Sequence, residues 1–140
     1  MPQPPHVMVH NLPQAQAALH AAADCGVSVI LESPLDAALS WGAPYFLKLI
    51  AAAREAAPAA QCEAILDCGD APGLALDALQ RGVKIIRLRA KKDVIARVAD
   101  IAGQHGARIE TQAQPKDLLD LDGARDPYKA ALSYFEGRRS

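Results

Sequence analysis

This sequence has few aromatic residues and almost no net charge. Phe, Trp and Tyr make up 4% of its 140 residues, and the formal net charge is −1 at pH 7. A chain without an excess of basic residues has no field that attracts nucleic acid or a membrane surface, so we expect neither partner. Sparse aromatics and abundant alanine favour closely packed helices over a β-sandwich.

The sequence also lacks a cysteine framework and long apolar runs. The three cysteines, Cys25, Cys62 and Cys68, are an odd number without CxxC spacing. This count argues against disulfides or a structural zinc site and fits a reducing cytoplasm. We see no signal peptide and no apolar run long enough to span a bilayer. Residues 1–6, which are rich in proline, are expected to be disordered, and residues 7–140 to form a single α/β domain.

Short apolar runs alternate with stretches of helical spacing along the rest of the chain. This alternation predicts four to five parallel strands, (βα)4-5, and a C-terminal helix. The pattern fits both a half TIM-barrel-like sheet and a flavodoxin-like sheet. Strands are expected at residues 7–10, 27–31, 64–66, 84–88 and 108–111. Helices are expected at residues 13–25, 44–57, 71–81, 93–105 and 127–136, a loop or short helix at 36–42, and a loop at 112–126.

The first helix carries clear end signals. Asn11 is suited to cap its N-terminus, Pro13 to occupy its first turn, and Gly26 to end it. Asp70 is expected to cap the helix that begins near Pro72.

The most informative stretch is Asp67-Cys68-Gly69-Asp70, which follows the third apolar run. In α/β proteins the chemistry gathers at the carboxyl ends of strands. Asp67 is therefore a candidate general acid or base, or else a local cap of backbone N–H groups. Cys68 is either a metal ligand or reactive thiol, or a small buried residue.

Strand alternation adds further candidates for a binding site. The parity of the third and fourth strands places Asp67 on one face with Arg87 and Arg89. Arginine binds phosphate and carboxylate groups in a bidentate manner, so an anion or sugar-phosphate site is one interpretation. A salt-bridge network is the other, since no Gly-rich phosphate loop accompanies the arginines. The other candidate ligand-binding residues, each near the end of its own strand, are His10, Glu32 and Glu110.

Residues 7–112 resemble the N-terminal half of the class II fructose- or tagatose-bisphosphate aldolases. The resemblance rests on His10-Asn11-Leu12, Val27 to Leu31, Trp41-Gly42, Leu66 to Gly69, and Ala78 to Ile86, in that order. Members of this family are zinc-dependent (β/α)8 barrels. The resemblance implies that Asp67 matches the family's catalytic aspartate.

The metal site of that family is altered in this sequence. Cys68 stands where the family has a zinc-ligand histidine, and Ile65 where it has another histidine. The pair Glu110 and Gln112 stands where the family has Glu-x-Glu. A catalytic zinc needs about three protein ligands, so we expect no metal and no cofactor.

Two functions follow as hypotheses. The first is a non-catalytic, aldolase-like half-barrel that acts by binding or assembly, with a phosphorylated or anionic small molecule as ligand. The second is a small lyase or isomerase that acts on a phosphorylated carbonyl compound, with Asp67 as acid or base. Because a short parallel sheet leaves two edge strands unpaired, we also expect a homodimer.

Overall fold

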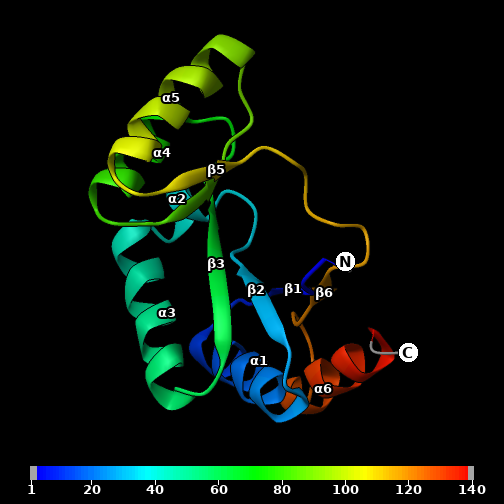
Figure 1. The fold of residues 1–140 in the computed structure, drawn as a ribbon. Helices are drawn as coiled ribbons and strands as arrows, with labels where there is room; N and C mark the ends of the chain where they lie inside the picture. Colours follow the sequence, from blue (N-terminus) through cyan, green and yellow to red (C-terminus); the bar gives the residue numbers. More distant parts are fainter. Residues whose placement is uncertain (1–2, 139–140) are drawn as a thin grey trace. The chain divides into compact units, whose positions relative to one another are not determined.

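The computed structural model describes residues 3–138, and it has the α/β fold that the sequence predicts. Helices alternate with strands that pair in parallel, and a helix closes the chain. The described chain divides into two compact units (Figure 1). Unit 1 contains residues 3–32, 48–63 and 114–138, and unit 2 contains residues 33–47 and 64–113.

Unit 1 combines the two ends of the chain. Strand β1 (His6–Met8) pairs in parallel with β2 (Ser28–Glu32) on one side and with β6 (Leu119–Asp120) on the other. Helices α1 (Leu12–Cys25) and α6 (Pro127–Arg138) lie side by side in Figure 1. Leu19 and Phe135 are among the fully buried side chains of this unit. Most of α3 (Ala43–Ala56) and the start of β3 (Gln61–Asp67) also belong to unit 1.

Unit 2 is built around the end of β3. Strand β4 (Ile85–Arg87) pairs in parallel with β3 and with β5 (Arg108–Glu110). Its helices are α2 (Ala37–Ser40), α4 (Pro72–Gln80) and α5 (Lys92–Gln104), together with the first turn of α3. The core consists of fully buried apolar side chains from β3, α4, β4 and α5, among them Leu66, Leu79, Ile86 and Ala102.

The capping signals of α1 are confirmed, whereas that of α4 is wrong. The side chain of Asn11 accepts the N–H of Gln14, and Gly26 ends α1 with a φ of 66°. The N-cap of α4 is Ala71 and makes no side-chain hydrogen bond, so Asp70 does not cap this helix.

Two predictions near the ends of the chain are corrected by the structure. The stretch 112–126, which we expected to be a loop, contains the short strand β6. Its pairing is extended by Leu121, which is fully buried and whose N–H donates to Met8 O at 3.1 Å. His6, which we expected in a disordered N-terminus, is the first residue of β1 and is buried. Residues 1–2 of that segment lie outside the described residues.

Candidate functional site

The C-terminal end of β3 lies against the segment that follows β2. Ser33 N–H donates to Ile65 O at 3.0 Å, as in a parallel ladder. Two residues further on, Asp67 N–H donates to the Ser33 hydroxyl oxygen at 2.9 Å, so a side chain takes the place of a backbone carbonyl. This arrangement fixes the position of Asp67, which is only 1% exposed.

The two carboxylate oxygens of Asp67 have different surroundings. Oδ1 accepts the backbone N–H of Asp36 at 3.0 Å and that of Gly69 at 2.9 Å. Oδ2 is buried and has no hydrogen-bond partner within the described residues, and the nearest cation is Arg89 Nη1 at 3.6 Å. Oδ1 therefore connects two loops by hydrogen bonds. Oδ2 is an acceptor to which no group of the described chain donates. A buried acceptor without a partner is uncommon in proteins and requires an explanation.

Asp36 and Gly69 share an unusual backbone conformation at this point. Asp36 has a φ of 59°, the only positive φ of a described residue other than glycine, and Gly69 has a φ of 58°. Both residues point an N–H at the same oxygen of Asp67. Left-handed conformations in residues other than glycine cost free energy and cluster at functional sites.

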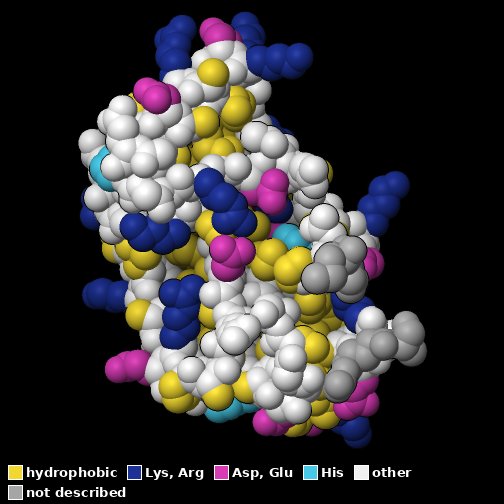
Figure 2. Space-filling view, viewed as in Figure 1, with side chains coloured by type: hydrophobic (Ala, Val, Ile, Leu, Met, Phe, Trp, Pro, Cys, Tyr) yellow, Lys and Arg dark blue, Asp and Glu magenta, His cyan; other side chains and the backbone are white. Residues whose placement is uncertain are grey.

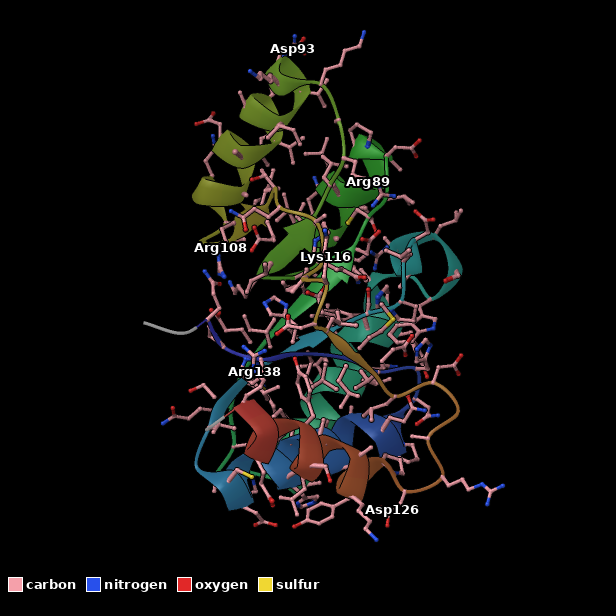
Figure 3. All side chains as sticks on the ribbon, turned by 90° about the vertical axis from the view of Figure 1, so that its right-hand side faces the viewer. Arg89, Asp93, Arg108, Lys116, Asp126 and Arg138 are labelled. Carbon is pink, nitrogen blue, oxygen red and sulfur yellow. The ribbon has the colours of Figure 1, made fainter. Side chains whose placement is uncertain are left out.

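Arg89 completes the cluster from the segment between β4 and α5 (Figure 3). Its backbone N–H donates to Gly69 O at 2.8 Å, which ties this segment to the loop after β3. Its guanidinium is 3.6 Å from Asp67 Oδ2 and 3.7 Å from Asp36 Oδ1, and its side chain is 56% exposed. Both distances exceed hydrogen-bond range but are short enough for ion pairs, so the guanidinium forms the salt-bridge network that was one of the two interpretations. Its N–H groups can still donate to a further acceptor.

Arg87 and Glu110 lie beside Asp67 on the neighbouring strands of unit 2. Asp67 is in register with Arg87, and Arg87 with Glu110, so all three project from one face. Arg87 is buried, and its Nε donates to Gln112 O at 2.9 Å. Glu110 accepts the N–H of Gln112 at 3.3 Å. Asp67, Arg87, Arg89 and Glu110 are all parts of unit 2. The strand register places Asp67 and Arg87 on one face, as the parity of the strands predicts for this pair.

The remaining predicted residues, His10 and Glu32, belong to unit 1, and each has a partner there. Glu32 is buried and its Oε2 lies 2.6 Å from His6 Nδ1. His10 Nε2 lies 2.7 Å from Asp120 Oδ1. The sequence did not single out His6 or Asp120, because neither pairing is local.

Cys68 does not have the properties of a reactive thiol. Burial, and to a smaller extent the charge of Asp67, raises its pKa to about 12. A thiol with that pKa is protonated at neutral pH, whereas nucleophilic attack and metal binding need the thiolate. Of the two interpretations of Cys68, the structure therefore favours the small buried residue.

The part of the chain that the structure describes holds neither a metal-ligand group nor a membrane-spanning helix. Residues 3–138 contain no group of three or more His, Cys, Asp or Glu side chains placed to hold a metal ion. Among the same residues, no helix has both the length and the apolar character needed to cross a membrane. On the face drawn in Figure 2, cationic and anionic side chains are interspersed.

Asp36 and Ser33 are the members of the cluster that the sequence did not reveal. A signal for them was present, since both directly follow the second predicted strand, where α/β folds gather functional groups. No family model matches the chain, and no curated protein is similar to it. The chemistry of the site must therefore be argued from the cluster of Asp36, Asp67 and Arg89 itself, which we call the Asp67 site.

Proposed function

We propose that this chain is a non-catalytic binding protein for a small anionic molecule, such as a phosphorylated one, which it holds at the Asp67 site. The observation that carries the proposal is the guanidinium of Arg89, which is exposed, makes no side-chain hydrogen bond within residues 3–138, and is anchored through its backbone to Gly69. A planar guanidinium with free donors matches the oxygens of a phosphate or carboxylate. The resemblance to class II aldolases supports a phosphorylated ligand.

The proposal is tested by thermal unfolding in the presence of inorganic phosphate. A ligand that binds only the native state raises the melting temperature, and the rise grows with the logarithm of its concentration once that exceeds Kd. We expect such a rise in the unmodified chain and its loss in Arg89→Gln. Arg97→Gln is the matched control, because Arg97 is an exposed arginine of the same unit that pairs only with Asp93 on its own helix. An equal rise in both variants would show that phosphate acts non-specifically.

The enzyme hypothesis is the second candidate, and one observation favours it. A carboxylate oxygen without a partner at the end of a strand, such as Asp67 Oδ2, is suited to accept a proton from a substrate. The assay is exchange of the carbon-bound protons of dihydroxyacetone phosphate in D₂O, followed by NMR. Exchange that is lost in Asp67→Asn would favour a lyase or isomerase over a binding protein.

We further propose that the chain assembles as a homodimer. Strands β5 and β6 each pair on one side only within their units, and three large apolar side chains, Leu35, Leu39 and Tyr45, are exposed in unit 2. Exposed edges and apolar side chains are commonly covered by a partner. Light scattering at micromolar concentration should give twice the chain mass of 14.8 kDa. Leu39→Asp should lower that mass, whereas the exposed Ser133→Asp should not.

A further inference from the structure

The charges of the Asp67 site favour an anionic ligand that also carries a positive group, because a simple anion would bind there more weakly. Within 4 Å, the single cation Arg89 faces two carboxylates, Asp36 and Asp67, so the cluster carries a net charge of −1. Arg87 and Glu110, on the neighbouring strands, add one charge of each sign. An anion bound to Arg89 would therefore approach two negative groups in a partly buried place, where like charges repel strongly.

The buried oxygen of Asp67 adds a second requirement. Asp67 Oδ2 lacks a hydrogen-bond donor within the described residues, and the residue is 1% exposed. A buried carboxylate oxygen gains most from a donor that carries positive charge. Arg89 is the nearest such group, but at 3.6 Å it does not make the bond.

We infer that the natural ligand is a small zwitterion, in which an ammonium group donates to Asp67 Oδ2 and a phosphate or carboxylate group accepts from Arg89. This inference rests on the proposed binding function and names its ligand class. A zwitterion brings the donor that Oδ2 lacks and adds less negative charge than the corresponding anion. It also explains why an arginine and an unpaired acceptor lie side by side.

The exposed side chain of Arg89 gives the ligand access. The guanidinium of Arg89 lies 3.6 Å from Asp67 Oδ2, and no hydrogen bond within residues 3–138 holds it there. Because this side chain is 56% exposed, its guanidinium can turn toward the anionic end of a ligand that approaches Asp67. The backbone of Arg89 stays fixed by its bond to Gly69 O.

Three probes of similar size separate the contributions of charge and hydrogen bonding. Ethyl phosphate supplies only the anion, 2-hydroxyethyl phosphate adds a neutral donor, and 2-aminoethyl phosphate adds an ammonium donor. Calorimetric titration of the full chain should give the tightest binding for 2-aminoethyl phosphate. We expect it to bind roughly tenfold or more tightly than ethyl phosphate, the range for one hydrogen bond between charged groups.

Because the two oxygens of Asp67 have different surroundings, one substitution can change Oδ2 and keep the hydrogen bonds of Oδ1. In Asp67→Asn the amide oxygen can still accept from Asp36 and Gly69, while the amide nitrogen replaces the unpaired Oδ2. The fold should therefore persist, and the preference for 2-aminoethyl phosphate should fall to about twofold or less, because the ammonium loses its charged partner. Asp93→Asn, an exposed carboxylate of the same unit, should leave the preference unchanged.

The outcomes separate this inference from the proposed function. Equal binding of all three probes, lost in Arg89→Gln, would overturn the zwitterion and leave anion binding intact. Equal binding of the hydroxyl and ammonium probes would overturn the argument from charge. Failure of every probe to bind the unmodified chain would overturn the proposed function and the inference together. A preference for the ammonium probe that survives in Asp67→Asn would show that Asp67 does not receive the ligand.

Discussion

The carboxylate of Asp36 occupies the space that a side chain on Gly69 would fill. A Cβ atom built on Gly69 would collide with Asp36 Oδ1, and the φ of Gly69, 58°, already lies in the left-handed region. Glycine at position 69 is favoured by its own backbone, and a side chain there would displace the exposed carboxylate of Asp36, more than thirty positions earlier. The two loops that supply N–H groups to Asp67 therefore meet where Gly69 faces the side chain of Asp36.

Gly69→Ala should therefore destabilise the protein, by about 1–2 kcal/mol, since alanine is strained at positive φ and the Asp36 side chain must move away from Arg89. Chemical denaturation measures this difference. The control is Gly103→Ala within α5, where a Cβ would meet no atom within 4 Å and φ is not positive. That substitution should stabilise the protein by roughly 0.5–1 kcal/mol, because alanine favours a helix interior. Equal effects of the two substitutions would contradict the described packing of Asp36 on Gly69.

Asp67→Ala should cost about 2 kcal/mol or more, because it leaves the N–H groups of Asp36 and Gly69 without their acceptor. Asp67→Asn should cost less than half as much, since its amide oxygen can accept both bonds. Urea unfolding of the two variants gives the comparison. Similar losses in both would mean that the negative charge, rather than the two hydrogen bonds, is what stabilises these loops.

Cys68 should resist alkylation by iodoacetamide in the native protein at pH 8, while the half-buried Cys62 reacts. Because burial raises the pKa of Cys68 to about 12, its thiolate population grows only toward strongly alkaline pH. Peptide mapping by mass spectrometry after timed labelling reports both rates. The rate at Cys68 should become comparable to that at Cys62 only when the protein is unfolded in guanidinium. Rapid native labelling of Cys68 at pH 8 would contradict its burial.

The purified protein should contain far less than one zinc ion per chain. A catalytic zinc site needs about three protein ligands, and residues 3–138 offer no group of three suitable side chains. Elemental analysis of protein purified without chelators checks this prediction. Stoichiometric metal that is lost in Cys68→Ala would instead support the hypothesis of an aldolase-like metal site with Cys68 as a ligand.

The sequence predicts the elements whose signals are local. The asparagine, proline and glycine around α1 describe a complete helix with both ends, and the structure contains it. The apolar run before Asp67 likewise predicts the strand that carries the site. Strand β6 was missed because it has only two residues and its pairing with β1 joins positions more than a hundred residues apart.

The residues of the site also divide into those with a local sequence signal and those placed by contacts between distant segments. Asp67 and Arg89 are predictable from strand ends and strand parity, since both rules act within one supersecondary unit. Asp36 takes part through its left-handed backbone, its N–H and its carboxylate, and the partners of these groups are more than thirty residues away in the sequence. The pair of His6 and Glu32 depends on the parallel register of β1 and β2, which a sequence alone does not specify.

Unit 1 is assembled from three separate segments of the chain, and this has a consequence for the order of folding. During synthesis, α1 emerges about a hundred residues before α6, the helix that it packs against. The side of α1 that packs against α6 therefore stays uncovered until α6 has been synthesised. Contacts between such distant segments slow folding and leave apolar surface open to aggregation in the meantime. Unit 2, whose strands follow one another closely, can collapse while the last segment of unit 1 is still being made.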